Sequence, residues 1–451
     1  MILASAQVFS SYHFIMGLSI IVILSYFFNL IAHRFNIPSV ILLIALGITI
    51  KMGLERFGLS LPEQYQFIFL EVMGVIGLIM IVLEAALDLK LQKKKKWLLI
   101  KSFLVALIVF LISSAGIAYL FTFMLTMPFQ IGLVYAIPLS IMSSAIIIPS
   151  VANLLQEKKE FMIYESTFSD ILGIMAFYML LGGIKSGANG AGSWTIAQEL
   201  TLSTLLTAVI SLIFSYLMVI LFQNIKGHGK LVLMVCILTF LYALGKINHL
   251  SPLLLILMFG LILNNKEVFF RGPLARFNKD TDGLSHVLLD EFKVVTIEAS
   301  FFIRTVFFVL FGMSIQLHTL SDPMVLAITG MVLAILYIVR YLNLRVFVQT
   351  SIFPELYIAP RGLITILLFY AIPKELQFED FNSGILLLTI ISTSLIMMLS
   401  LMLSGRGDNI DVMEDAILES VNATDAMIAQ SPPTSTVSSQ ASVSGSNDKQ
   451  E

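Results

Sequence analysis

YESTFSDILG, residues 164–173, lies inside the long run LLQEKKEFMIYESTFSDILGIMAFYMLLGG (154–183), and it places two carboxylates, Glu165 and Asp170, where hydrocarbon is expected. A charged side chain near the middle of a membrane is costly, so by default it marks a functional site. Five residues turn an α-helix by about 140°, so these two carboxylates face different directions. We therefore expect Glu165 and Asp170 to have different roles.

The composition of the whole chain agrees with a membrane location. Hydrophobic residues make up 58% of the 451 residues and charged residues 12%, and the charged share is roughly half that of a soluble domain. Apolar runs of about 18 or more residues recur, which is typical of transmembrane helices. The sequence thus predicts an all-α, multi-pass membrane protein.

The apolar runs predict about thirteen spans. We expect them near residues 13–33, 37–53, 66–88, 97–125, 130–155, 161–184, 198–223, 229–247, 250–264, 296–317, 323–346, 353–373 and 382–404. If 198–223 is a linker helix, residues 13–184 and 229–404 form two repeats of six spans within a membrane domain, 1–404. Residues 405–451 become acidic and then Ser-rich, so we expect a short, largely disordered cytoplasmic tail.

The positions of Lys and Arg predict the orientation. If the N-terminus is outside, most of these residues fall in inner loops, including the cluster KLQKKKKW (90–97), which we expect to be a cytoplasmic anchor of the stop-transfer kind and not a site of specific lipid recognition. The outer loops then hold Lys51, Arg56, Lys185, Lys246 and Lys374. We therefore expect a protein of the inner or plasma membrane with a cytoplasmic C-terminus.

Several functional classes lack support in the sequence. The formal net charge is −2, so no nucleic-acid partner is expected, and the single cysteine, Cys236, can form no intrachain disulfide. The chain has no phosphate-binding G-x-x-x-x-G-K-[ST] motif and no H-E-x-x-H motif. We therefore expect neither an enzyme nor a bound cofactor.

Asp170 is the candidate ion-binding residue. It lies roughly 14 Å from the cytoplasmic start of its span, near the middle of a core about 30 Å thick. Ser166, four residues earlier, shares its helix face. The alternative is that Asp170 merely pairs with an arginine, such as Arg361 or Arg304.

Glu165 is only about 6 Å deep and needs a cation, because an unpaired buried carboxylate is very costly. Arg340 lies at a matching depth on span 323–346, so we expect a structural Glu165–Arg340 ion pair. The alternative is that Arg340 faces Asp170. Lesser buried charges are Glu71, Glu84 and a Glu298/Arg304 pair on one span.

Two spans carry prolines that predict interrupted helices. In IPLSIMSSAIIIPSVANLL (137–155), Pro138 and Pro149 bracket Ser143 and Ser144. We expect freed carbonyls and the two serine hydroxyls to face a cation at this break, within about 8 Å of the Asp170 carboxylate.

The second interrupted span is FPELYIAPRGLITILLFYAIP (353–373), where Pro360 and Gly362 flank Arg361. Both spans are the fifth members of their repeats, and matching interruptions in two halves are typical of secondary transporters. We expect the two spans to cross and Arg361 to neutralise the carbonyl end of a half-helix. The alternative is a pair of ordinary proline kinks.

These residues together resemble the monovalent cation:proton antiporters, the sodium/proton exchanger superfamily, in their prokaryotic form. YESTFSD (164–170) resembles the family's E-S-x-x-[ND]-D signature. Other segments that look like family segments are LEAALDL (83–89), SSAIIIPSV (143–151), YIVRYL (337–342) and APRGLITILL (359–368).

The resemblance implies two inverted repeats with crossed, partly unwound helices, and a separate dimerisation domain that makes a homodimer. It implies that Asp170 binds an alkali cation and a proton in competition, that Ser166 is a ligand in some members, and that Glu165 and Arg340 form a structural pair.

The sequence departs from the family pattern at two places. Ser169 stands where electroneutral members carry Asn and electrogenic members carry Asp. Ser143 and Ser144 stand where many sodium exchangers carry Thr-Asp-Pro, so a second acidic ligand is missing, as in the potassium-linked branch. The cation can therefore be Na+ or K+.

The predicted function is exchange of one monovalent cation for one proton by alternating access. Burial in a low-dielectric site favours the neutral form of a carboxyl group. The site at Asp170 can therefore pass between the two sides of the membrane when it carries either a cation or a proton. Because Ser169 is not an acid, we see no second titrating group, and we expect the cycle to be electroneutral. The alternatives are a cation channel, whose wall also needs polar groups, and a proton-coupled solute carrier.

Overall fold

The structure is a computed structural model, and every regular element that it describes is a helix. It describes residues 11–35, 39–56, 63–89, 95–151, 154–187, 209–210, 212–217, 219–220, 230–247, 252–270, 284–314, 322–347, 352–378 and 380–403. The expected tail, 405–451, and most of the expected linker span, 198–223, lie outside these residues. The chain divides into two units, Met1–Ser404 and Gly405–Glu451, and the description below concerns the first.

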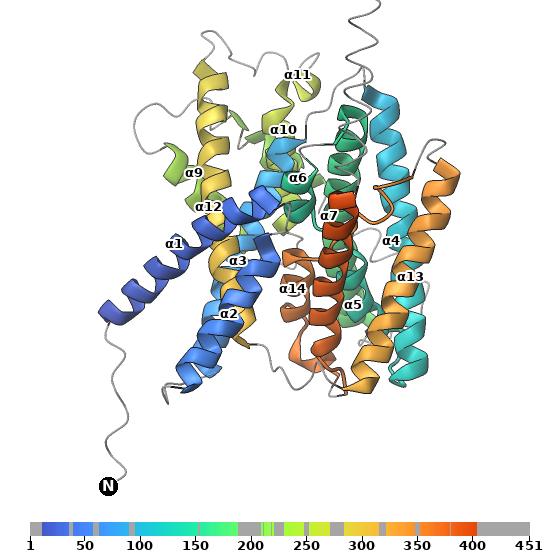
Figure 1. The fold of residues 1–451 in the computed structure, drawn as a ribbon. Helices are drawn as coiled ribbons and strands as arrows, with labels where there is room; N and C mark the ends of the chain where they lie inside the picture. Colours follow the sequence, from blue (N-terminus) through green and yellow to red (C-terminus); the bar gives the residue numbers. More distant parts are fainter. Residues whose placement is uncertain are drawn as a thin grey trace, which may run out of the picture. The chain divides into compact units, whose positions relative to one another are not determined.

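The helices follow the apolar runs of the sequence (Figure 1). They are α1 (Ser11–Phe35), α2 (Ser39–Arg56), α3 (Glu63–Asp88), α4 (Lys96–Met124), α5 (Phe129–Ser140), α6 (Ser144–Ser150), α7 (Gln156–Gly187), α9 (Lys230–Ile247), α10 (Pro252–Asn264), α11 (Lys266–Phe269), α12 (Leu284–Ser314), α13 (Pro323–Phe347) and α14 (Leu363–Tyr370). A last helix covers Gly384–Leu403.

Several of these segments suit a membrane. Among the described residues, six helical segments are long and apolar enough to cross one, and Ile15–Phe28, Met73–Leu87 and Leu255–Asn264 are shorter apolar helices. The chain is therefore a multi-pass membrane protein, and the elements that the structure describes are all helices.

The first predicted helix interruption is present, whereas the second span forms turns and non-helical backbone over 353–362 in place of a first half-helix. Helix α5 ends at Ser140, and the backbone is extended at Ile141 and Ser143 before α6 begins. In the second span, α14 begins only at Leu363, after a non-helical stretch at 358–362. Pro149, expected to mark the first break, lies instead inside α6, because the chain has already left the helix several residues earlier.

The two interruptions touch each other, as predicted for crossing spans. The Ser143 N–H donates a hydrogen bond of 2.9 Å to the Pro360 carbonyl. A Cβ atom on Gly362 would lie 2.6 Å from the Ser143 Oγ, so the glycine permits this close approach.

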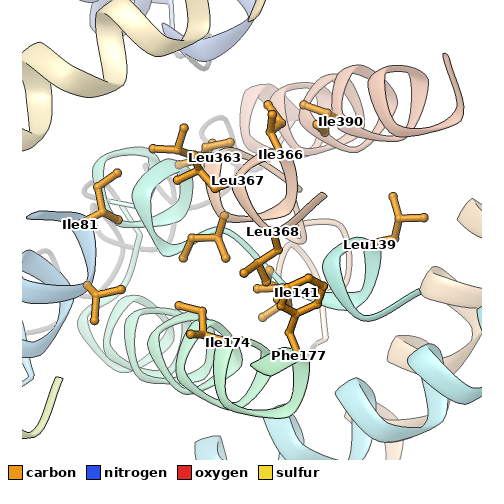
Figure 2. Packing of buried hydrophobic residues seen from close by; sticks show 14 of the residues in the cluster. Ile81, Leu139, Ile141, Ile174, Phe177, Leu363, Ile366, Leu367, Leu368 and Ile390 are labelled. Carbon is orange, nitrogen blue, oxygen red and sulfur yellow. The ribbon is translucent and has the colours of Figure 1, made fainter. Parts of the chain in front are cut away.

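Apolar side chains from several elements enclose the break. Figure 2 shows Ile141 beside Phe177 of α7, with Leu368 of α14 close by. A Cβ on Gly173 of α7 would lie 2.2 Å from the Ile141 side chain. The break therefore packs directly on α7, the helix that carries Asp170.

Candidate functional site

The Asp170 carboxylate lies at the break between α5 and α6. The side chain is buried, and its Oδ2 accepts a hydrogen bond of 3.2 Å from the Ser144 N–H. The prediction that Asp170 lies within about 8 Å of this break is thus confirmed.

Three consecutive backbone N–H groups of the break have acceptors from other elements. The Met142 N–H donates to the Ser169 Oγ at 3.0 Å, the Ser143 N–H to the Pro360 carbonyl, and the Ser144 N–H to Asp170. A buried backbone N–H without a partner is rare because it is costly. Neighbouring residues of α7 and the second broken span therefore hold the extended backbone in place.

Sequence reasoning missed this use of Ser169, which it treated only as a departure from a family pattern. The signal that could have indicated it is the position of a hydroxyl next to Asp170, on the helix that faces a predicted break. The acceptors for such a break must come from a neighbouring element, because the helix itself no longer supplies them.

Two polar atoms at the site have no hydrogen-bond partner among the described residues. They are the Asp170 Oδ1 and the Ser143 Oγ, and both are buried. The Ser166 hydroxyl, one turn before Asp170 on α7, is also buried and donates to the Ile163 carbonyl at 3.1 Å. Its oxygen retains an acceptor lone pair, so all three are oxygen atoms that suit a hard monovalent cation.

Asp170 has no arginine partner within the described residues, where the ion pairs join other carboxylates. Arg361, one alternative partner, is buried and donates to backbone instead. Its Nε lies 2.9 Å from the Leu139 carbonyl and its Nη2 lies 3.4 Å from that of Ser140. Arg361 thus places its positive charge at the C-terminal end of α5, which carries negative partial charge, as expected.

The predicted Glu165–Arg340 ion pair is present and completely buried. Arg340 donates to both Glu165 oxygens, at 2.6 and 3.1 Å. The same guanidinium donates to the Glu355 carbonyl, at 2.7 Å from Nη2. The pair therefore joins α7, α13 and the non-helical segment before α14, and the alternative that Arg340 faces Asp170 is wrong.

A further charged contact near this pair was missed. Lys158, at the start of α7, donates to the Phe353 carbonyl at 2.6 Å and to the Glu355 carboxylate at 3.3 Å. Glu355 is buried. Glu355 lies near the start of the apolar span 353–373, which weakly indicated a charge that needs a partner. The sequence could not show that this partner is Lys158.

The expected Glu298/Arg304 pair on one helix is wrong. Six residues turn a helix by about 240°, so the two side chains point in directions about 120° apart, and Glu298 is exposed. The Arg304 Nη2 instead lies 3.0 Å from Oε2 of Glu84 on α3, and its Nη1 donates to the Ala145 carbonyl of α6 at 3.3 Å. Arg304 is thus also unavailable as a simple partner for Asp170.

Comparison with known proteins gives a family match and a fold match. A family model described as "Sodium/hydrogen exchanger, transmembrane" matches residues 18–404. No curated protein matches the chain.

Two solved structures of the sodium proton antiporter MjNhaP1 from Methanocaldococcus jannaschii are similar to this chain. For the structure at pH 8 the TM-score is 0.66 at 21% identity, with 87% of this chain and 96% of that chain covered. For the electron microscopy structure the TM-score is 0.59 at 19% identity, with coverages of 89% and 97%. At these identities the likeness concerns the fold.

Proposed function

The chain belongs to the sodium/hydrogen exchanger family, and on that premise we propose that it is a secondary antiporter that exchanges a monovalent cation, Na+ or K+, for H+. The observation that carries this proposal is the state of Asp170. It is a buried carboxylate that accepts the Ser144 N–H, and its second oxygen has no hydrogen-bond partner in the described part of the chain, beside the contact between the two non-helical segments.

This arrangement can bind a cation or a proton, but not both at full strength. Either ion cancels the carboxylate charge, so the loaded site can move through the low-dielectric region, whereas the empty charged site pays a large desolvation cost. Because each load drives out the other, alternating access of one such site gives exchange. The ligands that we propose are Asp170, Ser166, Ser143 and Ser144.

The finer architecture is part of the proposal. Matching interruptions in the fifth span of each half support about thirteen spans arranged as inverted repeats, 13–184 and 229–404, with 198–223 as a linker. The Lys and Arg distribution supports a cell-membrane protein with the N-terminus outside, in contact with lipid headgroups. The family resemblance supports a homodimer.

The test is proton flux in proteoliposomes containing the purified protein. An outward gradient of Na+, K+ or Li+, imposed in turn, should drive saturable proton uptake with at least one cation. Flux of the cation that needs no counter-flux of protons would indicate a channel. Proton flux that depends on an organic solute would indicate a solute carrier.

A further inference from the structure

Pro149 leaves one carbonyl of α6 without its usual donor. In an α-helix the N–H of residue 149 would donate to the carbonyl of residue 145, but proline has no N–H. The Ala145 carbonyl receives the Arg304 Nη1 instead, at 3.3 Å. A side chain of α12 therefore replaces a backbone hydrogen bond of α6.

A second contact orients the same guanidinium. Its Nη2 lies 3.0 and 3.4 Å from the two oxygens of Glu84 on α3. The planar, forked guanidinium can donate in fixed directions to two groups at once. Glu84 thus orients the Arg304 guanidinium, and that guanidinium donates a hydrogen bond to the Ala145 carbonyl.

Ala145 adjoins the residue that contacts the ion-binding carboxylate. The Ser144 N–H, one residue before Ala145, is the donor to Asp170. The two groups lie in the first turn of a helix of 7 residues that follows an extended segment, so the helix has few hydrogen bonds of its own to fix that turn.

We propose that Arg304, oriented by Glu84, is a positioning residue for transport: by holding the Ala145 carbonyl that Pro149 leaves free, it keeps the start of α6 in the orientation that presents the Ser144 N–H to Asp170. Arg304 acts through the backbone of α6 and does not itself bind the transported ions. This inference rests on the proposed antiport function.

The proposal predicts a specific rescue. The paired variant Glu84→Gln/Arg304→Met removes the link without leaving one charge unpaired. It should weaken the apparent affinity for the cation by about tenfold, the effect of losing one charge-assisted hydrogen bond. Adding Pro149→Ala restores an N–H for the Ala145 carbonyl and should recover most of that loss.

Pro138→Ala is the matched control, because it restores an N–H to a carbonyl of α5 and should recover nothing. Failure of Pro149→Ala to improve affinity, or equal recovery with Pro138→Ala, would overturn the proposal. If the paired variant fails to fold, Arg304→Lys, which keeps a charge for Glu84 but loses the fork, replaces it in the same comparison.

Amide hydrogen exchange over residues 143–151 supplies a readout that needs no transport. The paired variant should exchange faster there, and Pro149→Ala should slow that exchange again; unchanged exchange would overturn the proposal. The two proposals can fail separately. If the parent protein shows no cation-coupled proton flux but the variants show these exchange changes, the antiport function is wrong and the role of Arg304 in fixing α6 is supported.

Discussion

Asp170 is a candidate ion ligand and also accepts a backbone hydrogen bond. Replacing one of its carboxylate oxygens with an amide nitrogen can separate the two roles. Asp170→Asn keeps an oxygen that can accept the Ser144 N–H, but its amide cannot release or bind a proton in the physiological range. We expect a folded protein, with a melting temperature near that of the parent, that has lost cation-coupled proton flux.

Asp322→Asn is the control for this change. Asp322 precedes α13, and its Oδ1 accepts the Met324 N–H at 2.9 Å, a contact that asparagine also makes. The same chemical change there should leave the flux intact. Normal exchange by Asp170→Asn would contradict the antiport mechanism proposed above.

Among the helices, the Glu165–Arg340 pair has the largest predicted effect on stability. Removing one partner leaves a buried charge uncompensated, at a cost of about 3–5 kcal/mol. Arg340→Ala should cost more than Glu165→Ala, because Arg340 also donates to the Glu355 carbonyl. Melting temperatures of the purified variants measure both losses.

The double variant Glu165→Ala/Arg340→Ala completes this cycle. It leaves neither charge buried alone, so it should lose less stability than the sum of the single variants. Strict additivity would show that the two side chains do not interact.

The crossing of the two broken spans predicts a second effect at the level of elements. A methyl group at position 362 would lie 2.6 Å from the Ser143 Oγ and 2.7 Å from the Ile146 side chain. Gly362→Ala should therefore push the spans apart, lowering transport rate and stability together.

Gly330→Ala is the matched control, since nothing lies within 4 Å of the added methyl group in α13. Alanine is the better helix former, so this change should be neutral or slightly stabilising. Equal behaviour of the two variants in flux and melting assays would show that the close approach at Gly362 has no importance.

The sequence predicted these elements unevenly, for physical reasons. Glu165 and Arg340 could be matched because a buried charge requires an opposite charge at its own depth, and prolines in apolar spans indicated both interruptions. The exact break at 141–143, and the acceptors Ser169 and Pro360, depend on how three helices are rotated against one another. The partner of Arg304 depends on the same packing, and the pattern of residues along one sequence does not specify how helices are rotated against one another.

For the molecule as a whole, the balance of buried charge determines how transport responds to voltage. Within the described part of the chain, Glu165 binds Arg340, Glu84 binds Arg304, and Glu355 binds Lys158. Arg361 donates to backbone carbonyls. Unlike Glu165, Glu84 and Glu355, Asp170 can exchange a bound proton for a bound cation without breaking one of these ion pairs.

Exchange should therefore be electroneutral, with one cation for one proton at Asp170. Moving one net charge across 100 mV is worth about 2.3 kcal/mol, which changes the equilibrium constant of an electrogenic exchange roughly 50-fold. An imposed membrane potential should instead leave both the rate and the final gradient unchanged in proteoliposomes. A pH gradient driven by potential alone would require a second carboxylate in the cycle, and Glu84 would then be the first suspect. In that case Glu84→Gln should abolish the response to voltage while cation–proton exchange continues.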